Sequence, residues 1–172
     1  MTLPVFGVTG WKNSGKTTLV TRLVTEFAGR GLSVSTIKHA HHDFDIDQPA
    51  TDSFRHRAAG AGEVLIVSGK RWALMHELRG EAEPVFESVL RRLSPCDLVL
   101  VEGYKRESIP KIEVRRSAAA GDRPLAPDDP TIAAIAADHP TDSRGLPCFA
   151  LDDVAAIADF IAGRLNLRSA HV

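Results

Sequence analysis

Cysteine is scarce in this sequence, and long apolar runs are missing. The 172 residues include two cysteines, Cys96 and Cys148, which are far apart and belong to no CxxC pair. This usage argues against a disulfide framework or a cysteine-ligated metal centre and favours free thiols in a cytoplasmic protein. No apolar run approaches the roughly 18 residues of a membrane-spanning helix. We therefore expect no membrane anchor, and no signal peptide, since the first apolar run leads directly into a glycine-rich loop.

An excess of charge of one sign is also missing. The 21 Lys and Arg residues and 22 Asp and Glu residues leave a formal net charge of −1. A chain so close to neutral lacks the basic surplus of a protein whose main partner is nucleic acid. The sequence contains no internal repeat, and its hydrophobic content of 44% is ample for one core. We therefore expect a single domain over residues 1–172.

The most informative motif is the glycine loop at residues 10–17, GWKNSGKT, which matches the phosphate-binding pattern GxxxxGK(S/T) at every fixed position. A short apolar segment, residues 5–9, precedes it and predicts a buried strand. Apolar residues at helical spacing follow it: Leu19, Val20, Leu23, Val24 and Phe27. Strand, loop and helix form the context that this motif requires, so a turn without a ligand is the weaker alternative.

The residue types of the loop explain its chemistry. Gly10 and Gly15 allow the backbone to curl, so that successive N–H groups face phosphate oxygens. The helix that begins near Lys16 adds the positive end of its dipole. Lys16 should reach the β- and γ-phosphates, and the Thr17 hydroxyl should ligate Mg²⁺. The expected nucleotide-binding set is completed by Lys12, Asn13, Ser14 and Thr18.

The rest of the chain alternates short strand-like runs with helical stripes. Strands are expected at residues 34–37, 98–101, 111–114, 131–137 and 147–151, a β-hairpin at 63–67 and 71–75, and helices at 52–61, from Pro84 (with Val85, Val89 and Leu93 on one face) and from Val154. The alanine-rich run 131–137 would also suit a helix. This order predicts an α/β fold, a three-layer P-loop NTPase domain with a mostly parallel sheet and a β-hairpin extension.

A second nucleotide-binding motif is the apolar run 98–101 followed by Glu102. A carboxylate at the carboxyl end of a central strand lies beside the phosphate loop in an open α/β sheet. Glu102 could hold Mg²⁺ through a water or orient an attacking water, so it is the candidate catalytic residue. P-loop proteins usually carry Asp here, and the longer Glu side chain leaves direct metal contact open.

Several further segments resemble the molybdopterin-guanine dinucleotide biosynthesis adapter protein B (MobB) family. The most specific is IKHAHH, residues 37–42, and the others are residues 52–53, 57–61, 71–75, 101–105, 109–113 and 135–138. Residues 49–53 depart from the usual Pro-Gly-Lys-Asp-Ser, and Tyr104 replaces a more common phenylalanine. The lost lysine weakens any assignment of that loop to phosphate contact.

The resemblance implies a GTP-binding accessory protein of molybdenum cofactor biosynthesis, with GTP and Mg²⁺ as ligands. Such proteins assist the guanylyltransferase that joins GMP to molybdopterin, form homodimers and have weak GTPase activity at most. Molybdopterin itself is a further candidate ligand. The resemblance leaves open whether the chain is an enzyme. It also leaves open whether Lys12 is a solvated loop lysine or reaches a partner's phosphates across a dimer.

A loop rich in histidine and aspartate follows the second strand. Its ionisable residues are His39, His41, His42, Asp43, Asp45 and Asp47. Imidazoles suit Zn or Ni, and carboxylates suit Mg or Mn. Asp45 and Asp47 are candidate Mg²⁺ ligands, and the histidines could donate to phosphate or to a pterin. The loop could instead act as a switch ordered by the γ-phosphate, or be a polar loop without function.

Recognition of the base is less defined, because the guanine motif Asn-Lys-x-Asp is absent. Asp138, after the run 131–137, is the candidate, since a carboxylate can accept from guanine N1–H and N2–H₂. A simple strand-ending acid is an equal alternative.

Two other functions remain open. One is a GTPase that delivers Ni or another metal, and the other is a small-molecule P-loop kinase. The hairpin is the candidate dimer interface, because apolar residues on an exposed edge favour pairing.

Overall fold

The computed structural model describes residues 3–40, 44–119 and 123–167. The chain packs as two compact units, one formed by residues 1–39 and 90–172 and the other by residues 40–89. The larger unit carries the phosphate loop. The smaller unit carries the hairpin.

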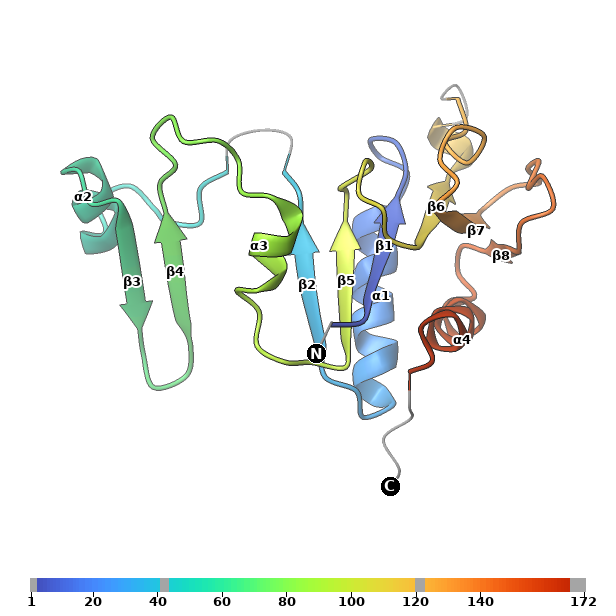
Figure 1. Ribbon diagram of the computed structural model, residues 1–172, viewed down its shortest axis with the longest axis horizontal. Coiled ribbons are helices and arrows are strands. Elements are labelled where there is room, and N and C mark those ends of the chain that lie inside the picture. Colours follow the sequence, from blue (N-terminus) through green and yellow to red (C-terminus); the bar gives the residue numbers. More distant parts are fainter. Residues whose placement is uncertain (1–2, 41–43, 120–122, 168–172) are drawn as a thin grey trace. The chain divides into compact units, whose positions relative to one another are not determined.

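The larger unit is built on a six-stranded sheet in the order β2-β5-β1-β6-β7-β8, in which every neighbouring pair is parallel (Figure 1). The strands are β1 (Val5–Thr9), β2 (Val34–Lys38), β5 (Leu98–Glu102), β6 (Lys111–Arg115), β7 (Ile132–Ala137) and β8 (Cys148–Ala150). All five residues of β5 are buried, as expected for a continuous apolar strand in the middle of a parallel sheet. The α/β class and the parallel sheet are therefore confirmed, and the alanine-rich run is a strand.

The core lies between this sheet and two helices, α1 (Lys16–Gly29) and α4 (Val154–Leu165), which pack against each other (Figure 1). Leu19, Leu23 and Phe27 of α1 are buried at the spacing that the sequence predicts. Alternate sheet residues complete the core: Phe6, Val8, Leu98, Leu100, Ile112, Val114, Ala134 and Ala136. The phosphate loop therefore runs from a buried strand directly into an anchored helix.

The smaller unit contains α2 (Asp52–Ala58) and a two-stranded antiparallel hairpin of β3 (Glu63–Val67) and β4 (Trp72–His76). The hydroxyl of Thr51 caps α2 by accepting from the N–H of Phe54. The hairpin is confirmed, displaced by one residue in its second strand. A 3-10 turn, η1 (Ser117–Ala119), follows β6 in the larger unit.

The helix expected from Pro84 is wrong in extent and in its buried face. The observed helix α3 covers Phe86–Leu90, and Phe86 is its buried residue, whereas Val85 is 65% exposed. A helix of five residues has little more than one turn, so spacing at three or four residues does not define a buried stripe in it.

In the described part of the chain no helix is both long and apolar enough to cross a membrane.

A buried lysine connects the amino ends of two neighbouring strands. Lys111 is 1% exposed, and its ammonium donates to Asp129 (3.1 Å), to the Thr131 hydroxyl and to the Glu107 carbonyl. Asp129 also accepts from the backbone N–H of Thr131 at 2.9 Å. Burial would raise the pKa of the Asp129 carboxyl, but the hydrogen bonds from Thr131 and Lys111 outweigh it, so the pKa lies below its usual value.

This network predicts a loss of stability in acid. The unfolded chain binds the Asp129 proton more tightly than the folded one. The stabilisation is therefore complete above the unfolded pKa, about 3.9, and is lost as the pH falls through the lower folded pKa. Urea unfolding of the wild type and Asp129→Asn should show a difference in free energy that is largest at neutral pH and shrinks toward about pH 3. Asp128→Asn, at an exposed pair with Arg123, is the control. A pH-independent difference would contradict the assignment.

Candidate functional site

The candidate site lies at the carboxyl ends of β1, β2, β5 and β6, inside the larger unit. Strand register brings its parts together, because Glu102 is opposite Val8 of β1 on one side and Lys38 of β2 on the other. The phosphate loop begins immediately after Thr9. Glu102 is thus placed beside the loop, as the sequence predicts.

Two glycines shape the loop. Gly10 has a φ of 147° and Gly15, the N-cap of α1, a φ of 93°, values that side chains strongly disfavour. A Cβ on Gly10 would lie 2.6 Å from the Val114 carbonyl oxygen and 2.7 Å from Ser14 Oγ. Asn13, with a φ of 63°, takes the left-handed conformation as well. The loop therefore rests directly on β6, without space for a larger residue.

Lys16 folds back over the loop, and its ammonium donates to the Trp11 carbonyl. Burial is the largest influence on its pKa and lowers it. Glu102 raises the pKa, and Lys105 and Lys38 lower it further, so that the net shift is downward. A neighbouring anion stabilises the charged form of an amine that is partly desolvated and lies near other cations. This is the environment expected of a phosphate-binding lysine.

Thr17 and Glu102, both predicted to serve Mg²⁺, are in direct contact. The Thr17 hydroxyl donates to Glu102 Oε1 at 2.7 Å, and the Glu102 side chain is 11% exposed. A hydroxyl and a carboxylate oxygen suit Mg²⁺, which keeps several waters and takes few protein ligands. Among the described residues no group of three or more His, Cys, Asp or Glu side chains could hold a metal ion. Thr17 and Glu102 thus fit a Mg²⁺ whose other ligands would be waters and phosphate oxygens.

Asp45 and Asp47 are used within the smaller unit. Asp45 forms an ion pair with Arg57 at 2.8 Å, and Asp47 accepts from the hydroxyls of Thr51 (2.8 Å) and Ser53 (2.9 Å). The pKa of Asp45 is lowered, first by the N–H of Asp47 and then by Arg57. These bonds hold the loop that leads into α2. Both carboxylates therefore have a structural role, and the assignment of Asp45 and Asp47 to Mg²⁺ stays a prediction.

The histidine-rich segment is described only in part. His39 follows β2 and donates its backbone N–H to the Glu102 carbonyl at 2.9 Å, and its ring lies 4.7 Å from that of Tyr104. A Cβ on Gly103 would approach the His39 Cβ to 3.1 Å. His39 therefore packs beside the end of β5. His41, His42 and Asp43 lie outside the described residues.

Asp138 directly follows β7 and connects two chain segments. Its carboxylate accepts from the Ser117 N–H at 2.7 Å and faces His139 Nδ1 at 2.8 Å. The hydrogen bond with His139 and then those from Ser117 lower the pKa of this carboxyl. Arg116 lies 3.8 Å away and also lies against Gly15, whose Cβ would be 3.5 Å from the guanidinium carbon. The candidate base-reading acid thus lies near the start of α1.

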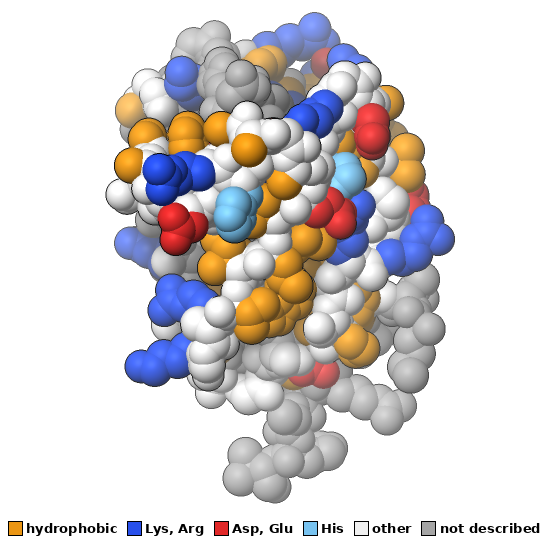
Figure 2. Space-filling view, turned by 90° about the vertical axis from the view of Figure 1, so that its left-hand side faces the viewer, with side chains coloured by type: hydrophobic (Ala, Val, Ile, Leu, Met, Phe, Trp, Pro, Cys, Tyr) orange, Lys and Arg blue, Asp and Glu red, His pale blue; other side chains and the backbone are white. Residues whose placement is uncertain are grey.

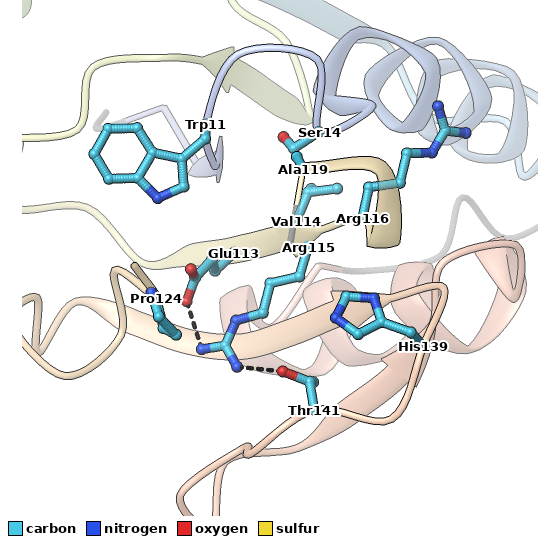
Figure 3. Close-up of a pocket in the computed structure, with 10 residues that line it drawn as sticks. All are labelled: Trp11, Ser14, Glu113, Val114, Arg115, Arg116, Ala119, Pro124, His139 and Thr141. Atoms are coloured by element: carbon cyan, nitrogen blue, oxygen red, sulfur yellow. Dashed lines mark hydrogen bonds and ion pairs between the residues drawn. The ribbon is translucent and has the colours of Figure 1, made fainter. Parts of the chain in front are cut away.

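A small cavity of about 140 Å³ adjoins the loop (Figure 3). It is lined by Trp11, Ser14, Glu113, Val114, Arg115, Arg116, Ala119, Pro124, His139 and Thr141. The guanidinium of Arg115 contacts Glu113 and Thr141, both at 2.8 Å. Two buried polar atoms of the lining, Ser14 Oγ and Arg115 Nε, have no hydrogen-bond partner in the described structure. The lining of the cavity therefore combines polar and apolar side chains.

Sequence reasoning missed several residues near the loop. Lys38 lies 3.4 Å from Glu102, and the Lys105 ammonium lies 4.0 Å from the centre of the Trp11 ring. Arg115 is the last residue of β6, and Arg116 follows it. Each lies at or just beyond the carboxyl end of a strand, which is the signal that could have identified them.

A parallel sheet, a glycine loop between β1 and α1, and an acid at the end of the adjacent strand β5 together define a P-loop domain. Comparison with known proteins makes the class specific. The chain belongs to the MobB family, described as molybdopterin guanine dinucleotide synthesis protein B, whose model matches residues 5–138. The resemblance found in the sequence is thereby confirmed.

Two relatives are named molybdopterin-guanine dinucleotide biosynthesis adapter protein. That of Escherichia coli (strain K12) is 39% identical over 163 residues, covering 92% of this chain and 91% of its own. That of Haemophilus influenzae is 38% identical over 168 residues, covering 95% and 90%. The crystal structure of a MobB homologue from Bacillus stearothermophilus has a TM-score of 0.73 and 27% identity, covering 96% of this chain and 100% of that one.

The close contact at Gly10 generates a prediction. Gly10→Ala should destabilise the folded protein by about 1–3 kcal/mol, because a Cβ there combines a strained φ with a clash against backbone. Denaturant unfolding measures this loss. Gly29→Ala is the matched control, since Gly29 lies in α1 and faces open space. The control should be neutral or stabilising by up to about 1 kcal/mol. Equal stability of both variants would argue against a loop fixed on β6.

Proposed function

We propose that this protein is a GTP-binding adapter of molybdenum cofactor biosynthesis, which assists a guanylyltransferase in converting molybdopterin to molybdopterin guanine dinucleotide. The observation that carries the proposal is the contact of Thr17 with Glu102 beside Lys16, on the phosphate loop of a MobB-family chain. The names of its relatives support the pathway. Membership of the family alone would leave the ligand open, and the loop supplies the reason for a nucleotide.

Phosphate and metal binding would follow from the residues already described. Backbone N–H groups of residues 12–17 would surround the phosphates, with Lys16 between the β- and γ-phosphates. Thr17 and Glu102 would hold Mg²⁺, which neutralises phosphate charge when bound. Glu102 is the candidate to orient a water. The Glu102 carboxylate is already engaged by Thr17 and Lys38. Because these contacts compete with a water, we propose weak GTPase activity at most and an accessory function.

The guanine would be read on the β6 and β7 side of the loop. Asp138 is our candidate acceptor for guanine N1–H and N2–H₂, and the polar side chains of Ser14 and Arg115 line the adjoining cavity. We propose that His39, with His41 and His42, belongs to a functional segment next to Glu102. Asp45 and Asp47 are less favoured for Mg²⁺ than Thr17 and Glu102, since both already bind other side chains.

A second copy of the chain is the proposed partner of the hairpin. Val64 and Met75 form the buried face of the hairpin, and the other face is apolar and exposed. That face consists of Leu65, Val67, Trp72 and Leu74, which are 42–68% exposed. Figure 2, which views the side of α2 and β3, shows hydrophobic side chains gathered among charged ones. Isologous pairing of such a patch is the commonest way to cover it. We propose that the protein is a cytoplasmic homodimer and that the hairpin forms its interface.

The alternatives receive less support. Metal delivery would need a cargo site, and the sequence has no CxxC or Cys-His pair to supply one. A small-molecule kinase would release a phosphorylated product rather than free phosphate. The near-neutral charge offers no basis for nucleic-acid binding.

Calorimetric titration tests the nucleotide site. With Mg²⁺, the wild type should bind GTP and its non-hydrolysable analogue more tightly than ATP. Lys16→Ala should weaken binding by about tenfold to a hundredfold, because it removes a charged hydrogen-bond donor to phosphate. Arg22→Ala, on the exposed side of α1, is the control. Equal or tighter ATP binding would favour the kinase instead.

Light scattering tests the hairpin interface. The wild type at micromolar concentration should have twice the 18.6 kDa mass of the chain. Leu65→Glu with Trp72→Glu should yield a monomer, because two buried charges oppose pairing. Lys70→Glu, in the hairpin turn, should remain dimeric. A monomeric wild type, with and without nucleotide, would contradict the proposed dimer.

A further inference from the structure

A lysine outside the glycine loop lies at the point where Thr17 and Glu102 meet. Lys38 is the last residue of β2, and parallel pairing places it directly opposite Glu102. Its ammonium lies 3.4 Å from Glu102 Oε1. The same oxygen accepts the hydroxyl of Thr17 at 2.7 Å. An ammonium, a hydroxyl and a carboxylate therefore converge on one position.

The cations in this region outnumber the anions. Lys38 and Lys105 both lower the pKa of Lys16 electrostatically, and the Glu102 carboxylate raises it. The side chain of Glu102 is 11% exposed, whereas that of Lys38 is 61% exposed and open to an incoming ligand. Lys16, Lys38 and Lys105 together with the single carboxylate of Glu102 leave a positive excess beside the loop. Such an excess suits a ligand with several negative charges.

The position of Lys38 identifies which part of that ligand it would meet. In a P-loop site, the Ser or Thr after the loop lysine ligates the Mg²⁺ that bridges the β- and γ-phosphates. In this chain that residue is Thr17, and Lys38 contacts the same Glu102 oxygen as Thr17 does. Lys38 would therefore lie nearer to the terminal phosphate than to the nucleoside.

We propose that Lys38 is a second phosphate-binding lysine, which contacts the terminal phosphate of a bound nucleoside triphosphate. This inference rests on the nucleotide-binding function proposed above. Without ligand, Lys38 neutralises Glu102. If Thr17 and Glu102 bound Mg²⁺, Lys38 would be free to donate to a γ-phosphate oxygen. A diphosphate offers no acceptor there, so Lys38 makes the site favour triphosphate over diphosphate.

The experiment compares two ligands across three proteins. Non-hydrolysable GTP and GDP are titrated calorimetrically with Mg²⁺ into the wild type, Lys38→Ala and the control Lys70→Ala, which removes an exposed lysine from the hairpin turn. Lys38→Ala should weaken triphosphate binding by about tenfold and leave diphosphate binding within about twofold, because one charge-assisted hydrogen bond is lost. The control should match the wild type for both ligands.

Two further proteins, Glu102→Gln and the double variant Lys38→Ala with Glu102→Gln, separate direct contact from an effect through Glu102. If Lys38 only neutralised that carboxylate, Glu102→Gln would remove the need for Lys38, and the double variant would bind triphosphate as tightly as Glu102→Gln alone. We expect the tenfold loss to persist in the double variant. Rescue there, equal loss for both ligands, or no loss would each overturn the assignment of Lys38 while the nucleotide site stands. A wild type that binds neither ligand would overturn the nucleotide function, and this inference with it.

Discussion

The parallel pairing of β5 with both β1 and β2 is the constraint on which the site depends. Parallel neighbours end at the same edge of a sheet, so one register fixes the phosphate loop, Glu102 and Lys38 together. A slip of one residue along β5 would turn the Glu102 side chain to the other face of the sheet. Close packing of β5 on both faces opposes such a slip, because Leu98 and Leu100 would have to occupy the positions of the smaller Val99 and Val101. Hydrophobic packing thereby sets the geometry of a charged site.

Much of this arrangement is encoded locally and was predictable. The loop with its flanking strand and helix, the apolar run that ends in Glu102, and the hairpin of β3 and β4 each carry a pattern within a few residues. The alanine-rich run of β7 was ambiguous by propensity. It is a strand because Ala134 and Ala136 belong to the core that the sheet shares with α1 and α4, and tertiary packing outweighs a weak helix preference.

The parts that were not predictable depend on contacts between distant segments. Nothing near Lys38 in the sequence shows that Glu102 is its neighbour, because 64 positions separate the two and the register alone joins them. Asp45 and Asp47 show the converse. Their spacing suggested a metal site, whereas Arg57, Thr51 and Ser53 engage both carboxylates in the structure. A cluster of acids in sequence carries no information on how many of their oxygens are already used.

The placement of the two tryptophans has a practical consequence. Trp11 lies in the phosphate loop, where its indole N–H donates to the Arg123 carbonyl at 2.6 Å and its ring faces the ammonium of Lys105. The other, Trp72, is 66% exposed on the hairpin. The larger unit and the smaller unit therefore each contain a single tryptophan. Replacing either indole with phenylalanine would leave tryptophan emission from the other unit alone, and events at the loop and at the hairpin could be followed separately without an added dye.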